Sequence, residues 1–245
     1  MMQEHEAPGA GAPVELKNST PLDVRRRWRS NKLLAACEIV AVLLIFVADW
    51  RHMIWFSKTP FLFVLAWVSL RLRGMRWKSI GLAWFRNWRI SLLLGLAAGI
   101  GMSLLELLVT QPLLVRFTGK QPDLEGFRQL TGNLWLFLLL VLLSWVQAGI
   151  GEEGVYRGYV MNRVADLGNR TRGSWIVSLI LVSTLFGFAH TYQGITGVIE
   201  AAVAGLLLGL LYLRCGRNLA VPIIAHGLSD TVDFLLIFLG KYPGM

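Results

Sequence analysis

Seven long apolar segments most limit what this 245-residue chain can fold into. Each approaches or exceeds the roughly 18–20 residues that a helix needs to cross the hydrocarbon core of a bilayer. A helix can span lipid because it pairs all its backbone polar groups internally. The sequence therefore predicts an all-α, polytopic membrane helical bundle of about seven transmembrane helices, or eight if one more span follows. The predicted spans are Leu33–Trp50, Trp55–Leu72, Ile90–Val109, Leu134–Ala165, Ser174–Thr191, Thr196–Leu213 and Leu219–Leu239.

Composition supports a membrane class. Hydrophobic residues make up 55% of the chain, above the roughly 45–50% of soluble domains. The second predicted span is the weakest because it contains Lys58 and Pro60. Residues 1–30 are expected to form a disordered cytoplasmic tail, since their first 20 positions are rich in Ala, Pro, Gly and Glu. The membrane domain is then residues 31–245. A loop outside the membrane is expected over 111–132, where Pro and Gly interrupt the apolar pattern.

The net charge of +9 does not indicate nucleic-acid binding, because the basic residues are distributed as in a membrane protein. If the N-terminus is cytoplasmic, 18 of the 24 Lys and Arg fall in cytoplasmic segments and six in outer ones. This is the positive-inside bias. It predicts an integral, multi-pass protein of a bacterial-type cytoplasmic membrane, in contact with lipid and with no nucleic-acid partner.

Three ionisable residues interrupt the fourth span: Glu152, Glu153 and Arg157. Each charged side chain near the bilayer centre costs roughly 2.5–3.5 kcal/mol on insertion scales, so such residues indicate a functional site. Glu153 and Arg157 are four residues apart, in the order that favours an ion pair. An ion pair leaves Glu152 unexplained. A second carboxylate in low dielectric is a candidate general base.

Two further polar groups lie in later spans. His190 ends the fifth span in the sequence FGFAH, and His226 and Asp230 lie four residues apart in the seventh. At about 1.5 Å per residue, all of these and Glu152 lie about 13–25 Å from the inner surface. They can therefore converge inside the bilayer. Glu106, in the third span, could belong to the site, but a structural pairing role is favoured.

These three motifs resemble those of the CAAX protease and bacteriocin-processing family, which includes the type II CAAX prenyl endopeptidases and bacterial proteins of the abortive-infection group. The family patterns are EExxxR, FxxxH and HxxxN/D. Here they read Glu152-Glu153-Gly-Val-Tyr-Arg157, Phe186-Gly-Phe-Ala-His190 and His226-Gly-Leu-Ser-Asp230. The resemblance covers about residues 140–235 and implies a catalytic core at about 133–239.

The resemblance also implies roles. Glu152 would activate a water, His190 would orient it, and Glu153 and Arg157 would brace the site. His226 and residue 230 would face the oxyanion. Eukaryotic-type members carry Asn where this chain has Asp230, so this carboxyl must be protonated or must hold His226. The implied activity is endopeptidase cleavage of a membrane-associated protein or peptide, with the cavity open toward the cytoplasm or inner leaflet.

Three alternatives stay open. Zinc could be held by His190, His226 and Glu152, although the HExxH motif of zinc proteases is absent from the spans; metal-free hydrolysis without a cofactor is preferred. A non-catalytic scaffold or immunity protein would have no need of desolvated carboxylates. A transporter could use these groups as a proton relay, but the chain lacks paired halves with broken helices. Neither the substrate nor the oligomeric state can be inferred from the sequence.

Overall fold

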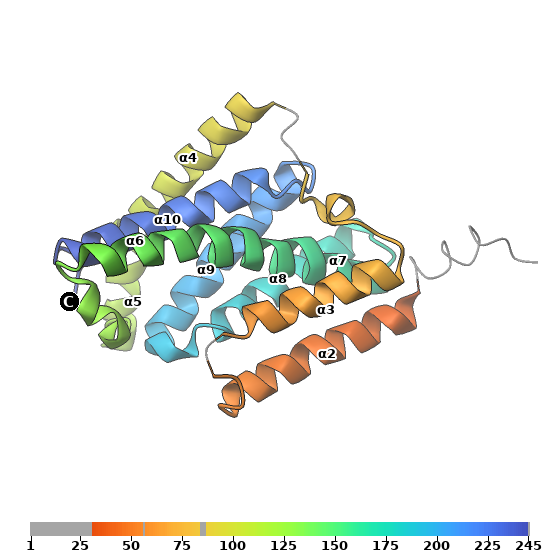
Figure 1. Cartoon of the computed structure of the whole chain (residues 1–245), viewed down its shortest axis with the longest axis horizontal. Coiled ribbons are helices and arrows are strands. Elements are labelled where there is room, and N and C mark those ends of the chain that lie inside the picture. Colours follow the sequence, from red (N-terminus) through yellow and green to blue (C-terminus); the bar gives the residue numbers. More distant parts are fainter. Residues whose placement is uncertain (1–30, 56, 84–86, 245) are drawn as a thin grey trace, which may run out of the picture.

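The computed structural model describes residues 31–55, 57–83 and 87–244, and every regular element in these ranges is helical (Figure 1). The α-helices are α2 (Lys32–Trp50), α3 (Thr59–Leu72), α4 (Trp88–Leu105), α5 (Gln111–Thr118), α6 (Leu134–Leu143), α7 (Met161–Leu167), α8 (Arg172–Phe188), α9 (Gly194–Arg214) and α10 (Ala220–Phe238). Two π-helical segments are η2 (Glu106–Thr110) and η4 (Ser144–Val160). Short 3-10 helices are η1 (Trp77–Ile80), η3 (Glu125–Leu130) and η5 (Thr191–Gln193). The predicted disordered tail lies outside the described residues.

The all-α membrane bundle predicted from the apolar segments is confirmed. Five continuous helices are long and apolar enough to cross a membrane: Lys32–Trp50, Trp88–Thr118, Leu134–Leu167, Thr191–Arg214 and Ala220–Phe238. Two shorter apolar helices, α3 and α8, occupy the second and fifth predicted spans. Large apolar side chains are exposed along α2, α4, α6 and α8, as expected of surfaces that face lipid tails.

Two boundaries differ from the predicted ones. The second helix begins at Thr59, because Pro60 suits the first turn of a helix, where no N–H is needed. Lys58, just before it, is held by Asp49, whose Oδ2 lies 2.8 Å from its Nζ. The predicted outer loop at 111–132 is also shorter, because helix continues to Thr118. The π-helical segment η2 precedes Pro112 and accommodates its missing N–H.

The fourth span is a single helix of 34 residues, Leu134–Leu167, close to the predicted Leu134–Ala165. Its middle is the π-helical segment η4, which carries the EExxxR motif. Side-chain bonds anchor both ends: Asn133 caps its first turn, and Asp166 receives Arg170 Nη1 at 2.9 Å. π-helical turns are frequent at functional sites, because they change which side chains share a face.

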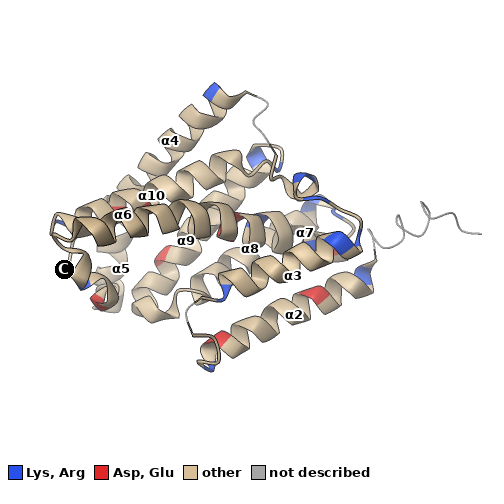
Figure 2. Ribbon diagram, viewed as in Figure 1, with Lys and Arg blue, Asp and Glu red and all other residues tan. Residues whose placement is uncertain are grey.

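Helix α10 lies at the centre of the bundle (Figure 1). It packs against α4 on one side and against η4 on the other, while α8 pairs with α9, and α2 and α3 cover the far side of the long helix. In Figure 2, most Lys and Arg positions gather at the end of the bundle where α2 begins and α3 ends. The chain terminus, α5 and the start of α6 lie at the opposite end.

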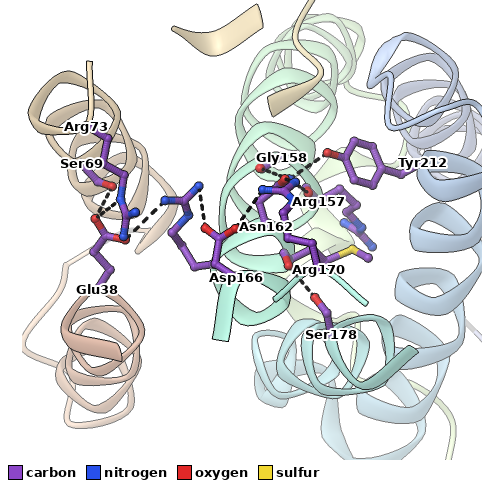
Figure 3. Close-up of polar contacts among 12 residues, drawn as sticks. Glu38, Ser69, Arg73, Arg157, Gly158, Asn162, Asp166, Arg170, Ser178 and Tyr212 are labelled. Atoms are coloured by element: carbon purple, nitrogen blue, oxygen red, sulfur yellow. Dashed lines mark hydrogen bonds and ion pairs between the residues drawn. The ribbon is translucent and has the colours of Figure 1, made fainter. Parts of the chain in front are cut away.

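A buried polar network fastens α2 and α3 to α7 (Figure 3). Arg73 Nη2 lies 2.7 Å from Glu38 Oε2, and Ser69 Oγ donates to Glu38 Oε1 at 2.6 Å. Arg163 on α7 lies 3.8 Å from the same carboxylate and 3.2 Å from Asp166. Buried charges of this kind are tolerated only when they are paired. The network therefore fixes how the first two helices dock on the core.

Candidate active site

The carboxylates of Glu152 and Glu153, which are adjacent in η4, lie in different environments. Glu153 has no exposed surface, whereas Glu152 is half-buried and lines a cavity. The hydroxyl of Thr59, at the start of α3, donates to Glu152 Oε1 at 3.3 Å. Glu152 is thus available to a ligand in the cavity, and Glu153 is not.

Glu153 connects two of the three motifs. Its Oε1 receives Arg157 Nη1 at 2.7 Å and His226 Nδ1 at 2.8 Å, so one oxygen joins η4 to α10. Arg157, of which only 1% is exposed, also donates from Nη2 to the carbonyl of Gly205 on α9 at 3.1 Å. Hydrogen bonds to charged groups are stronger than neutral ones, and buried ones resist rearrangement. This chain of contacts holds His226 in one orientation.

His190 lies just beyond the end of α8, where the helix gives way to η5. Its Nδ1 donates to the carbonyl of Phe186 at 2.9 Å, which leaves Nε2 free to accept a hydrogen. The Phe186 ring lies 4.8 Å from the His190 ring and 5.8 Å from the His226 ring. Arg157 Cζ lies 4.4 Å from the same ring, in a cation–π contact. Phe186 thus separates and positions the two imidazoles.

Asp230 lies beside His226 on α10 without a hydrogen bond to it. Its Oδ1 is 3.7 Å from His226 Nε2, which is too long for one. About a quarter of the Asp230 side chain is exposed, at 27%. Nε2 of His226 and the Asp230 carboxyl therefore both face the cavity.

A cavity of about 330 Å³ collects these groups. Its walls include Glu152, His190, His226 and Asp230, which come from three separate parts of the bundle. Glu153 and Arg157 lie behind the wall. All six residues singled out from the sequence are therefore brought together, four at the cavity and two in its support.

Within the described ranges, no three His, Cys, Asp or Glu side chains are grouped as a metal site would require. The zinc set considered from the sequence, His190, His226 and Glu152, does not fit such a site. Nδ1 of His226 is committed to Glu153, and Nε2 faces another carboxyl.

Sequence reasoning missed several groups at or next to the cavity. Thr59, which falls in the weakest predicted span, does not itself line the cavity but donates a hydrogen bond to Glu152. Glu200, Asp233 and Tyr242 line the cavity, as does Glu106, which had been assigned a pairing role. Tyr242 Oη does donate to Glu106 Oε1 at 3.2 Å. Glu200 and Asp233 are ionisable residues inside predicted spans, and that signal could have identified them.

Residues 133–232 match the model of a family described as type II CAAX prenyl endopeptidase, Rce1-like. No curated protein and no solved structure matches the chain. The matched residues contain the EExxxR, FxxxH and HxxxN/D motifs, and therefore the six residues described above. The matched segment runs from the residue that caps α6 to the middle of α10. Over this helical core, the chain is therefore similar to the type II CAAX prenyl endopeptidase Rce1-like family.

Proposed function

We propose that this protein is an intramembrane endopeptidase that hydrolyses peptide bonds by glutamate-activated water. The observation that carries the proposal is the convergence of Glu152, His190 and His226 on one cavity inside the bundle. These side chains come from segments far apart in the sequence: Glu152 and His226 lie in long apolar helices, and His190 lies directly after the apolar helix α8. Desolvated ionisable groups that share a cavity indicate chemistry rather than folding.

Glu152 acts as the general base. Its carboxylate takes a proton from a water molecule, and the water oxygen attacks the carbonyl carbon of the scissile bond. Nε2 of His190 accepts a hydrogen bond from that water and orients it, because Nδ1 is held by Phe186. When the C–N bond breaks, Glu152 returns the proton to the leaving amine, so the carboxylate is regenerated.

His226 stabilises the oxyanion. With its second proton, Nε2 donates to the negative oxygen of the tetrahedral intermediate, and Glu153 compensates the charge of the ring through Nδ1. Donors fixed in this way act without reorganising during the reaction. Asp230, 3.7 Å from Nε2, keeps that nitrogen within the cavity and flanks the oxyanion site as a neutral carboxyl.

The distribution of basic residues orients the protein. The end rich in Lys and Arg, where α2 begins, lies on the cytoplasmic side of a bacterial-type membrane (Figure 2). The cavity extends toward the other end, because η3, Tyr192 and Tyr242 contribute to its walls. It therefore faces the outer side, which differs from the cytoplasmic opening expected from the resemblance. A substrate anchored in the membrane approaches from that side.

Replacing Glu152 with Gln tests the proposal. The amide keeps the size of the side chain but cannot accept the proton of water, so we expect cleavage to fall at least about 10²-fold. The measurement compares newly formed protein termini in membranes that contain the wild-type or the Glu152→Gln protein, followed by cleavage of the identified substrate in proteoliposomes. Glu125→Gln, an exposed carboxylate on η3, is the control. Undiminished cleavage by the Glu152→Gln protein would rule out this base.

A further inference from the structure

The cavity continues beyond the proposed catalytic groups into a second acidic region, here called the acidic pole, which consists of Glu106, Glu200 and Asp233. All three line the cavity, and they come from η2, α9 and α10. None belongs to the three motifs that carry the chemistry. Their presence in lipid-spanning helices costs free energy, so each needs a reason to be there.

Glu200 provides the strongest sign that the acidic pole binds something. It is 9% exposed, and its Oε1 has no hydrogen-bond partner among the described residues. Oδ1 of Asp233 is likewise buried and unpartnered within that part of the chain. A buried acceptor without a donor is costly, and a buried carboxylate without a cation is costlier still. The fold thus leaves two acceptors unsatisfied in a cavity that a ligand can enter.

No ion pair joins a described basic side chain to the carboxyls of the acidic pole, and His226, which also lines the cavity, is held by Glu153. Among the described residues that line the cavity, no Lys or Arg occurs. Glu106 repels both Glu200 and Asp233, and the Tyr242 hydroxyl donates to Glu106 Oε1 at 3.2 Å. Arg157 is committed to Glu153 behind the wall. A cation brought by the ligand would supply both the missing charge and the missing donors.

A metal ion does not fit this requirement, since the described residues hold no grouping of three side chains suited to one. An organic cation needs no such close grouping, because an ammonium or guanidinium presents several N–H donors spread over its surface. Asp233 lies three residues after Asp230 on α10, about 4.5 Å along the helix axis. The acidic pole is therefore within side-chain reach of a peptide bond held beside Asp230.

We propose that the acidic pole is a specificity subsite, in which Glu106, Glu200 and Asp233 bind a Lys or Arg side chain of the substrate close to the scissile bond. This rests on the proposed endopeptidase function and adds the class of substrate to it: a membrane-associated polypeptide with a basic residue near the cleavage site. The substrate's cation pairs with the unpartnered carboxylates, while the peptide bond lies between Glu152 and His226.

Binding can be measured without turnover, in full-length protein that carries Glu152→Gln in nanodiscs. The probes are a series of short, fluorophore-labelled, N-acylated peptides. Each peptide carries a single Lys at a different position, and its control carries norleucine at that same position. We expect that, at one of these positions, the Lys peptide binds with a Kd about tenfold lower than its norleucine control. Adding Glu200→Gln, or separately Asp233→Asn, should reduce that ratio to about threefold or less. Adding Glu125→Gln should leave it unchanged.

The proposal is overturned if no position prefers Lys, or if the preference survives both acidic-pole variants. The same holds if Glu200→Gln and Asp233→Asn weaken Lys and norleucine peptides equally, because that would show a structural role. If the three carboxyls are instead protonated and neutral, norleucine peptides will bind as well as Lys peptides. Cleavage is measured separately with the wild-type protein. Cleavage without a preference for Lys peptides would contradict only the proposed subsite. Selective binding of Lys peptides without any cleavage would contradict only the proposed endopeptidase function.

Discussion

At the scale of single residues, the two adjacent glutamates have separate environments. Glu153 is enclosed and shares one oxygen between Arg157 and His226, whereas Glu152 lines the cavity next to Thr59. A protein environment can give neighbouring carboxylates different tasks in this way. Glu153 therefore holds η4 and α10 together, and Glu152 is exposed to the cavity, as the proposed general base must be.

Removing Arg157 should cost stability as well as activity. Arg157→Ala leaves Glu153 as a buried charge without its main partner, a change that typically costs about 3–5 kcal/mol. We expect poor accumulation in membranes, a lower midpoint of thermal unfolding in detergent and little cleavage. Arg128→Ala, which breaks an exposed ion pair with Glu125, is the matched control and should behave as wild type. Normal accumulation of a fully active Arg157→Ala protein would show that this brace is dispensable.

Asp230 should tolerate conversion to Asn better than to Ala. The amide can lie beside Nε2 of His226 as the carboxyl does, and it can donate a hydrogen bond to an oxyanion. Asp230→Asn should keep kcat/KM within about tenfold of wild type, and Asp230→Ala should lose about a further tenfold, since one oxyanion donor typically matters by that much or more. Steady-state cleavage kinetics measure both. Equal, severe losses in the two variants would mean that the carboxyl itself is required.

At the scale of elements, close contact between α8 and α9 positions His190. A Cβ added at Gly187, inside the FGFAH motif, would lie 2.6 Å from the carbonyl oxygen of Val198 and 2.8 Å from the Cβ of Ala202. Small residues at such contacts let helices in a membrane approach closely. The absence of a side chain at Gly187 therefore sets the distance between the helix that ends at His190 and its neighbour.

Gly187→Ala should force α8 and α9 apart. Overpacking of this kind typically costs about 1–3 kcal/mol, and it should also displace His190 and reduce cleavage. Thermal unfolding in detergent and kcat/KM would both be measured. Gly101→Ala on α4 is the control, because a Cβ there meets nothing within 4 Å. If the two variants proved equally stable and active, packing at Gly187 would have no part in placing His190.

At the scale of the whole molecule, the basic residues and the cavity lie toward opposite ends of the bundle. Lys and Arg gather where α2 begins and α3 ends (Figure 2), whereas η3 and Tyr242 help to close the cavity toward the other end. If the positive-inside rule holds for this protein, we expect the cavity to lie in the outer half of the membrane. The direction from which a substrate enters thus depends on the arrangement of the entire bundle.

Cysteine labelling tests this orientation. Gly126 on η3 and Gly173 on α8 lie at opposite ends, both are exposed, and a Cβ at either meets no atom within 4 Å. In a chain with Cys37 and Cys215 replaced by Ser, Gly126→Cys should react with a membrane-impermeant maleimide on intact cells. Gly173→Cys should react only after permeabilisation. The reverse labelling pattern would show that the protein has the opposite orientation in the membrane, with the cavity on the cytoplasmic side.

The sequence by itself determined the class of fold and identified the polar groups that line or support the cavity. Long apolar runs can be read one at a time, because the free energy of moving a helix into lipid depends mainly on its own side chains. For the same reason, the 34-residue fourth span and the polar residues within it were visible in advance. Spacing of four residues also identified Glu153 and Arg157 as partners.

Only the tertiary structure decided how those groups meet. Thr59 and Glu152 are separated by 93 residues, and Glu153 and His226 by 73, so no local pattern links them. The π-helical form of η4, the buried pair of Glu38 and Arg73, and the acidic pole likewise depend on which faces the packed helices turn inward. Hydropathy specifies that a helix enters the membrane, but its rotation and neighbours are set by packing and by the need to pair every buried charge.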